Sequence, residues 1–185
     1  MRHWVAPSLC YVLADLENIG YQVVGHIPRR GKGSGLVPVP AWKEEFVWQG
    51  LLDFEEWPAL TNPESGFVVC ANHGLGPDLS WDFNSGIRAQ RIEHLLAAQS
   101  DHDWRSFARI QMDIFSSPAR RFADLCLKLT EFPHPWMIQD LRRWDGNMRA
   151  DSRAALLAGC GLLCLTELAL PDQWRGLFLG PDTHH

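Results

Sequence analysis

The stretch from Asn62 to His73 carries the residues of this chain with the clearest chemical potential. It opens on a turn made of Asn, Pro and Gly, continues as a short apolar run and ends on the amide side chain of Asn72. We predict that residues 66–72 form a buried strand, which would hold the two N–H donors of Asn72 in a fixed position. Such donors can stabilise the oxyanion that forms when an amide or ester is attacked. The alternative is that Asn72 only caps its own turn, which is a common role for asparagine in loops.

Other residue types in the chain could act as a nucleophile or bind a metal ion. Cys70 or Ser80, together with His73, would provide a nucleophile and a base, but their spacing does not support an independent enzyme of this kind. The histidines His26, His73 and His94 do not follow the H-x-x-x-H pattern of metal hydrolases. We therefore predict no metal site among them.

The elements that must position Asn72 begin with strands. A hairpin is predicted at residues 10–27, with its first strand at 11–16 and its second at 19–27. Residues 28–40 are rich in Arg, Lys, Gly and Pro and are predicted to form a long loop. That loop lacks the Walker spacing and no helix follows it directly, so we reject a phosphate cradle there. Residues 41–60 are predicted to be irregular and aromatic.

The second half of the chain is predicted to be helical, with Ser85 as an N-cap of the first helix and Ser116-Ser117-Pro118 as the start of the third. Asp113 and Asp145 are expected to have structural roles, the latter together with Gly146 as a helix stop. Strands followed by helices indicate an α+β fold. The predicted helices lie at residues 85–98, 101–114, 118–129, 136–144 and 151–168, and a frayed tail is predicted from Pro171 onward.

Composition limits the classes of function. The chain has 185 residues, is 46% hydrophobic and carries a formal net charge of −5 without a basic stripe, so nucleic acid is not an expected partner. No apolar run approaches the roughly 20 residues of a membrane span. Nine Trp and nine Phe stand beside two Tyr, and we expect some of these rings to leave an adhesive surface.

The five cysteines are predicted to be small apolar filler. Their number is odd, their spacings are wide and no CxxC motif occurs, so both a structural zinc site and a disulfide framework are disfavoured. Cys160 and Cys164 are four residues apart on a predicted helix and would share one face.

A series of short motifs in a fixed order accompanies Asn72. The segment itself, Asn-Pro-x-x-Gly-aromatic-apolar leading to Ala71-Asn72, resembles the penicillin acylase (penicillin amidase) family of N-terminal nucleophile hydrolases. The resemblance covers about residues 9–168, so we expect a single partial domain over residues 1–185, with 171–185 as a tail. The further matching motifs are Tyr11-Val12-Leu13-Ala14-Asp15, Asn18-Ile19-Gly20-Tyr21, Gly25-His26-Ile27-Pro28-Arg29-Arg30, Pro38-Val39-Pro40-Ala41-Trp42, Trp48-Gln49-Gly50, Phe54-Glu55-Glu56-Trp57-Pro58, Arg88-Ala89-Gln90-Arg91-Ile92, Gln111-Met112-Asp113 and Trp144-Asp145-Gly146.

The resemblance implies roles for three residues. Asn72 matches the side-chain donor of the family's oxyanion hole. Arg88 matches an arginine near the active site that supports substrate binding and self-processing, although it could equally be a surface helix residue in an ordinary salt bridge. His73 follows Asn72 and could touch substrate, whereas its plain alternative is a solvent-facing loop histidine.

The resemblance also implies that the attacking group is absent from these residues. In this family a Ser, Thr or Cys at the N-terminus of the larger chain, exposed by self-cleavage, is the nucleophile, and its own α-amine is the base. This chain begins Met1-Arg2-His3-Trp4, and the family places the nucleophile well upstream of Asn18. We therefore expect an internal part of the larger catalytic chain, belonging to the family's four-layer fold and inactive alone. Its partners would be the remaining parts of the parent enzyme or a companion chain.

The expected parent reaction is hydrolysis of linear amides, such as N-acyl side chains of β-lactams, acyl-homoserine lactones or related acylated amines. No cofactor is expected for this chain. The resemblance leaves calcium as an optional ligand of the parent enzyme, because some family members bind calcium through an Asp in the region that corresponds to Asp78 and Asp82. Two carboxylates supply too few of the six to eight oxygens that calcium needs. An export signal, for a periplasmic or secreted parent, would lie on another part. The alternative function is a non-catalytic remnant or interaction module that binds another chain through its Trp-rich surface.

Overall fold

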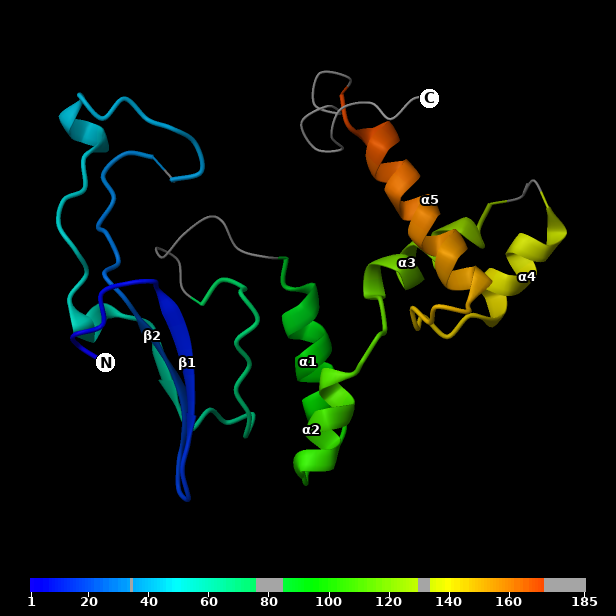
Figure 1. Ribbon diagram of the computed structural model, residues 1–185, viewed down its shortest axis with the longest axis horizontal. Coiled ribbons are helices and arrows are strands. Elements are labelled where there is room, and N and C mark those ends of the chain that lie inside the picture. The colour runs from blue at the N-terminus through cyan, green and yellow to red at the C-terminus, as the bar shows by residue number, and fades with distance from the viewer. Residues whose placement is uncertain (34, 76–84, 130–133, 172–185) are drawn as a thin grey trace. The chain divides into compact units, whose positions relative to one another are not determined.

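The computed structural model describes residues 1–33, 35–75, 85–129 and 134–171 (Figure 1). The chain divides into two compact units, Met1–Trp104 and Arg105–His185. A small sheet lies in the first unit and packed helices form the second, so the predicted α+β class is confirmed. That residues 1–185 make up one partial domain stays a prediction.

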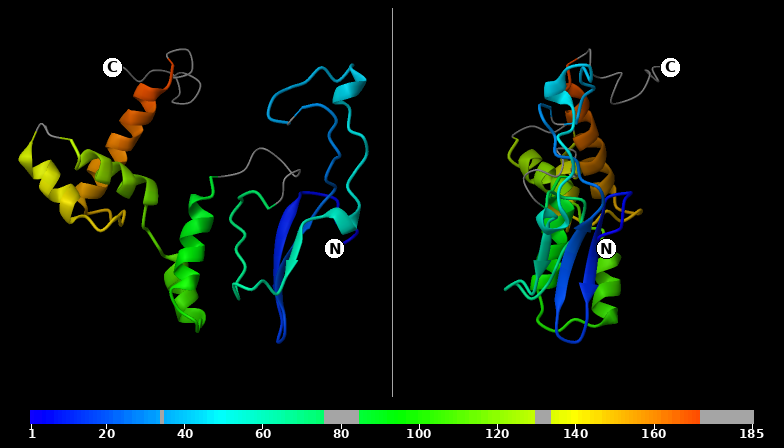
Figure 2. Two further views of the ribbon diagram at one scale, coloured as in Figure 1. Left: turned by 180° about the vertical axis from the view of Figure 1, so that it is seen from behind. Right: turned by 90° about the vertical axis from the view of Figure 1, so that its left-hand side faces the viewer.

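A hairpin and one further strand form an antiparallel sheet in the first unit. β1 (Leu9–Ala14) pairs with β2 (Ile19–Val24), and β2 pairs with β3 (Ala59–Thr61), which gives the order β1-β2-β3 (Figure 2). The hairpin predicted at residues 10–27 is therefore present. β3 is a correction, because it lies in the stretch that was predicted to be irregular.

Asp15 determines where the first strand ends. Its Oδ1 atom accepts hydrogen bonds from the backbone N–H groups of Glu17 at 2.8 Å and of Asn18 at 2.7 Å. The chain therefore turns directly after Ala14, earlier than the predicted strand end at Leu16. The same two N–H groups hold the pKa of Asp15 below its ordinary value, because they stabilise the carboxylate.

β2 is the buried strand because it has a neighbour on both sides. Val24 is fully buried and packs with Val23 and Trp57 in the core of the first unit. β3 approaches β2 closely at Gly20, where a Cβ atom would collide with the carbonyl oxygen of Leu60. This close approach explains the glycine in the middle of a strand.

Ion pairs fix the long loop that follows the hairpin. Arg29 pairs with Glu56, and the Lys32 Nζ atom lies 3.3 Å from a carboxylate oxygen of Glu45. These basic side chains therefore bind carboxylates of the segment that follows the loop, in agreement with the rejection of a phosphate cradle. Two short 3-10 turns lie in this region, η1 (Glu44–Phe46) and η2 (Phe54–Glu56).

The segment before Asn72 does not pair as a strand, so the predicted strand at residues 66–72 is wrong. The ladder position beside β2 belongs to β3, and among the residues that the structure describes no strand pairs with 67–70. A disulfide between Cys10 of β1 and Cys70 ties this segment to the sheet instead. An apolar run predicts extended backbone, but it does not predict the neighbour.

The described part of the chain continues with five helices, in the order that the sequence predicts. The hydroxyls of Ser116 and Ser152 cap two of them by accepting hydrogen bonds from backbone N–H groups, at 3.3 and 3.1 Å. The predicted cap at Ser85 is wrong, because Gly86 occupies the N-cap position. The helices are α1 (Ile87–Ala97), α2 (Trp104–Gln111), α3 (Ser117–Cys126), α4 (Pro135–Arg143) and α5 (Arg153–Ala169). The second helix thus starts at Trp104 and not at Asp101, and the predicted tail lies almost entirely outside the described residues.

Small side chains bring α3, α4 and α5 together in the second unit. Ala123 and Ala158 are completely buried, and the indole of Trp144 closes the core beside them. Gly146, with φ of 87°, ends the α4 region as predicted and packs against the ring of Phe115. Within the described part of the chain, no helix is both long enough and apolar enough to cross a membrane.

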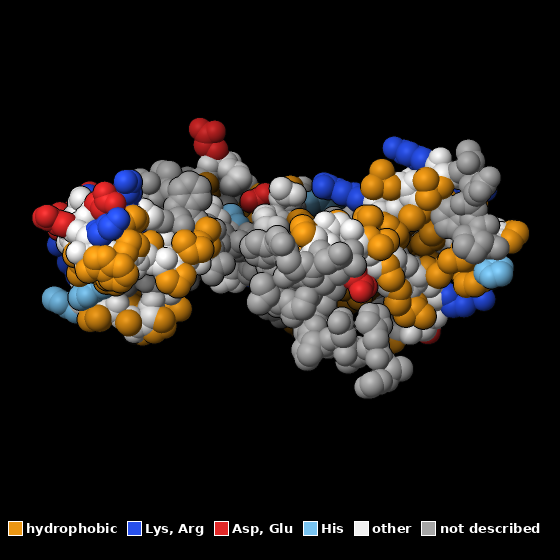
Figure 3. All heavy atoms as spheres, turned by 90° about the horizontal axis from the view of Figure 1, so that it is seen from above, with side chains coloured by type: hydrophobic (Ala, Val, Ile, Leu, Met, Phe, Trp, Pro, Cys, Tyr) orange, Lys and Arg blue, Asp and Glu red, His pale blue; other side chains and the backbone are white. Residues whose placement is uncertain are grey.

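Large apolar side chains remain on the surface, as the composition predicts (Figure 3). Trp42 is 86% exposed on the loop of the first unit. On α5, Leu156 and Leu163 are each 67% exposed and Leu168 is 74% exposed. Both units therefore present apolar surface that would bind another protein surface favourably.

The cysteines behave differently from one another. Cys126 is half-buried and packs against the core of the second unit, as the filler prediction requires. Cys160 and Cys164 are exposed on α5, so the prediction is wrong for them. It is also wrong for Cys10 and Cys70, which the sequence separates by 60 positions and the fold brings to a Cα distance of 6.7 Å.

Candidate functional site

Asn72 has a backbone conformation that few residues adopt. Its φ is 56°, in the left-handed region, and among non-glycine residues Asn tolerates this region best. The preceding residue, Ala71, is 97% buried by contrast with the exposed Asn72 side chain. The chain is therefore anchored at Ala71 and turns sharply at Asn72, which exposes the amide.

Arg88 determines which end of the Asn72 amide is available. One of its guanidinium nitrogens donates to the carbonyl oxygen of Ala71 at 2.7 Å, and it also donates to Oδ1 of Asn72. A guanidinium can only donate, so the Asn72 atom that faces it must be the amide oxygen. The Nδ2 group of Asn72 is left with its two N–H donors, and no acceptor for them lies among the described residues.

The position of Arg88 on its helix also bears on this contact. Arg88 is in the first turn of α1, where the partial positive charge of the helix N-terminus disfavours a cation. The two oxygens of Ala71 and Asn72 offset this cost by accepting its hydrogen bonds. A positive charge thus lies on the far side of the same amide group from the Nδ2 donors, where it would favour a developing negative charge.

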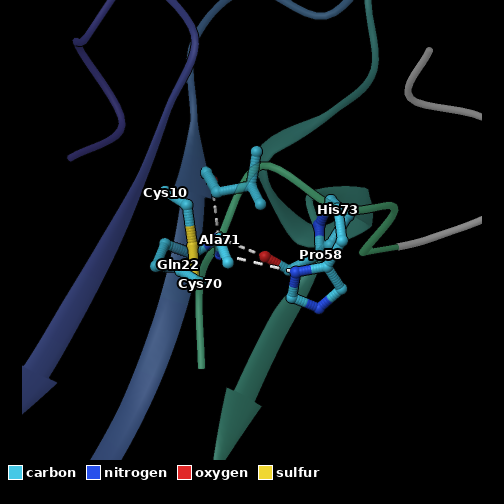
Figure 4. Close-up of a disulfide and its surroundings, with 7 residues drawn as sticks. Cys10, Gln22, Pro58, Cys70, Ala71 and His73 are labelled. Carbon is cyan, nitrogen blue, oxygen red and sulfur yellow. Dashed lines mark hydrogen bonds between the residues drawn. A yellow bond between two sulfur atoms is a disulfide. The ribbon is translucent and has the colours of Figure 1, made fainter. Parts of the chain in front are cut away.

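His73 lies beside the same turn. Its Nδ1 atom accepts a hydrogen bond from the backbone N–H of Ala71 at 3.4 Å (Figure 4). The half-buried ring lines a cavity of about 490 Å³. The cavity walls come from the sheet, the Asn72 segment and α1, and include Tyr21, Leu60, Phe67, Val68, Val69, Leu75 and Glu93. The apolar side chains of this mixed lining could contact an apolar group of a ligand.

The disulfide reaches this site from the sheet. Cys10 on β1 is joined to Cys70, the residue before Ala71, as Figure 4 shows. Cys70 therefore has no free thiol, so it cannot form the nucleophile of an independent enzyme with His73. Sequence reasoning missed this cross-link, because neither cysteine lies in a spacing motif.

Several other candidate residues contribute nothing here. Asp78, Asp82 and Ser80 lie outside the described residues, so calcium binding by the parent stays a prediction. His26 and His94 are exposed. In the ranges that the structure describes, no group of three or more His, Cys, Asp or Glu side chains could hold a metal ion.

Known proteins share this sequence and fold. The model of the family described as Penicillin amidase matches residues 1–178. The acyl-homoserine lactone acylase QuiP of Pseudomonas syringae pv. tomato is 32% identical over 200 aligned positions, which cover 96% of this chain and 23% of that protein. The penicillin acylase 2 proenzyme of Pseudomonas sp. is 31% identical over 177 positions, which cover 90% of this chain and 23% of that protein.

A solved structure has the same fold. The thermostable penicillin G acylase of Alcaligenes faecalis superimposes with a TM-score of 0.65 at 18% identity, over 94% of this chain and 35% of that chain. The chain spans about a quarter of the length of the two curated relatives. The family model matches almost the whole chain, and the fold agrees with it. The predicted resemblance to this family is therefore confirmed, and the chain belongs to the penicillin amidase family.

Proposed function

We propose that this chain supplies the side-chain donor of the oxyanion hole to an acylase that hydrolyses linear amides. Asn72 would donate from Nδ2 to the oxyanion of the tetrahedral intermediate. Arg88 would hold the amide in the orientation that presents Nδ2, and His73 would contact the acyl group from the cavity wall. The observation that carries the proposal is the hydrogen bond from Arg88 to Oδ1 of a left-handed Asn72.

The names of the relatives indicate the substrate class. They are acyl-homoserine lactone acylases and penicillin acylases, so the substrate we propose is an acylated amine with an apolar acyl group. The apolar side chains in the cavity beside His73, among them Phe67, Val68 and Val69, support the acyl part of that assignment. In the parent reaction a nucleophile attacks the amide carbonyl carbon, and the carbonyl oxygen becomes the anion that Asn72 stabilises.

We propose further that the nucleophile comes from outside this chain. The thiol nearest to Asn72 in sequence, Cys70, is consumed in the disulfide. The exposed leucines of α5 and the exposed Trp42 give the chain apolar surface for a companion chain that carries an N-terminal Ser, Thr or Cys. The same surface would serve a non-catalytic interaction module, and this second candidate predicts binding of a companion chain without turnover.

The testing experiment replaces Asn72 by glycine in the enzyme assembled with its companion chain. Glycine accepts the left-handed backbone as readily as Asn, whereas alanine would add backbone strain to the loss of the amide. We expect Asn72→Gly to lower kcat for a chromogenic phenylacetyl amide or an acyl-homoserine lactone by about 10²–10³.

The matched control is Asn62→Gly. Asn62 is also left-handed, with φ of 49°, but its side chain binds the backbone N–H of Ile19 and the side chain of Asn18. This change should reduce stability and leave kcat unaltered. Full activity of the Asn72→Gly enzyme would remove Asn72 from the mechanism, and turnover by the folded chain alone would overturn the external nucleophile.

A further inference from the structure

We propose that the Cys10–Cys70 disulfide is the positioning device of Asn72, so that reduction of this bond releases the oxyanion donor while the sheet stays folded. The catalytic part of the inference rests on the proposed function of Asn72. The structural part concerns this chain alone and is tested separately.

The Cys10 end of the bond is a rigid anchor. Cys10 is in register with Val23 on β2, the strand that carries the buried core of the first unit. Val23 and Val24 are 6% and 0% exposed. The position of the Cys10 sulfur is therefore determined by the hairpin and its core, which do not need the disulfide to pair.

The Cys70 end lies in a segment with few other restraints. No strand of the described chain pairs with residues 67–70, and the Phe67 carbonyl binds the nearby hydroxyl of Ser65. A single residue, Ala71, separates Cys70 from Asn72. The carbonyl oxygen of Ala71 accepts a hydrogen bond from Arg88. The disulfide and the Arg88 contact thus hold the turn at Asn72 from two sides. Loss of the disulfide leaves the Arg88 contact, the burial of Ala71 and the local hydrogen bond from Ala71 to His73.

A small dithiol can reach this bond, because Cys10 and Cys70 are both half-buried. A thiolate of the dithiol attacks one sulfur, the S–S bond breaks and a mixed disulfide forms. The second thiolate of the reagent then releases the remaining cysteine. The protein gains two electrons and two protons as two thiols, and the dithiol becomes its cyclic disulfide.

The first test uses the full chain and needs no activity. Hydrogen exchange is followed by mass spectrometry with and without dithiothreitol, in a Cys126→Ser/Cys160→Ser/Cys164→Ser background that keeps the disulfide. We expect the amides of residues 67–73 to exchange about tenfold faster after reduction, with protection of β2 unchanged. Cys10→Ser/Cys70→Ser should show the fast exchange without reductant. Equal loss of protection in β2, or no change at 67–73, would overturn the proposal.

The second test is a double-mutant cycle in the assembled enzyme. Cys10→Ser/Cys70→Ser should lower kcat by about 10- to 100-fold with little change in KM, since misplacing a catalytic group by about 1 Å has effects of this size. In an Asn72→Gly background the same change should cost nothing further, because the displaced amide is already absent. Additive effects would show a general structural role and contradict the proposal.

The two tests separate the two claims. If Asn72→Gly retains full activity, the proposed function fails, and the hydrogen exchange result still decides whether the disulfide positions the turn. If the exchange result is negative while Asn72→Gly is inactive, the function stands and the positioning role is overturned.

Discussion

Asn72 and Arg88 interact directly, and the contact accounts for the orientation of the Asn72 amide and for the position of the Arg88 guanidinium. The left-handed turn exposes the Asn72 amide, and the guanidinium occupies its oxygen and leaves its N–H donors available. In the oxyanion hole that we propose, a donor prepared in this way would not reorganise as the oxyanion forms, and such preorganisation is the main source of catalytic value in a site of this kind. Either residue alone has an ordinary structural explanation, and the pairing makes a functional role the better account.

Arg88→Lys tests whether geometry or charge matters at this position. Lysine keeps the positive charge but cannot offer the planar set of donors that reaches both Ala71 and Asn72. We expect kcat of the assembled enzyme to fall about tenfold with KM nearly constant. The matched control is Arg121→Lys on an exposed position of α3, which should behave like the unchanged enzyme. Equal kcat values for both variants would reduce Arg88 to a surface charge.

The connections between elements rely on short-range polar groups. Asp145 lies between α4 and α5, and accepts hydrogen bonds from the backbone and side chain of Asn147 at 2.9 and 2.8 Å and from Arg149 at 2.8 Å. These bonds, those of Asn147 first, lower the pKa of Asp145 from 3.8 to about 2. The Asp145 motif is therefore a structural stop that fixes how the chain leaves α4, as the sequence predicts.

The lowered pKa gives a pH dependence with a definite sign. Because the folded pKa lies below the unfolded one, the Asp145 contribution is complete above about pH 3.8 and is lost as pH falls toward 2. We expect Asp145→Asn to lower Tm at about pH 5 and to match the unchanged chain near pH 2. The control Asp151→Asn, at an exposed position of the same connection, should leave the pH profile of Tm unaltered. Parallel profiles for all three proteins would contradict the assignment.

Across the whole chain, many large apolar side chains are exposed, whereas the two hydrophobic cores are small. The second unit buries mainly alanines, whereas the leucines of α5 remain exposed. Leu156 and Leu163 are seven residues apart and share a face of the helix. This distribution fits a chain that completes its packing against a companion chain.

Leu156→Gln/Leu163→Gln tests that expectation. Glutamine is a good helix former, so α5 should persist. Each replaced leucine removes roughly 1.5–3 kcal/mol of the binding free energy that its burial at the interface would contribute. We expect Kd for the companion chain to rise at least about tenfold, as measured by titration of the labelled chain. Leu16→Gln, at a fully exposed position in the hairpin turn, is the control and should not change Kd. An unchanged Kd for the double variant would exclude this face from the interface.

The sequence by itself determined the family, the α+β class, the hairpin and the order of the helices. These features depend on local patterns, such as the hairpin turn at Glu17-Asn18, the helix start at Ser116 and the stop at Gly146, and on an ordered set of motifs around Asn72. Local patterns are readable because the residues that interact are close in the chain.

Only the tertiary structure decided how Asn72 is held. The sequence predicted a strand at residues 66–72 and no disulfide, but an extended run does not encode its neighbour, and β3 occupies the place beside β2. The Cys10–Cys70 bond and the contact between Arg88 and Asn72 join residues that are 60 and 16 positions apart. Such contacts depend on the folded path of the whole unit, and for that reason no local spacing could predict them.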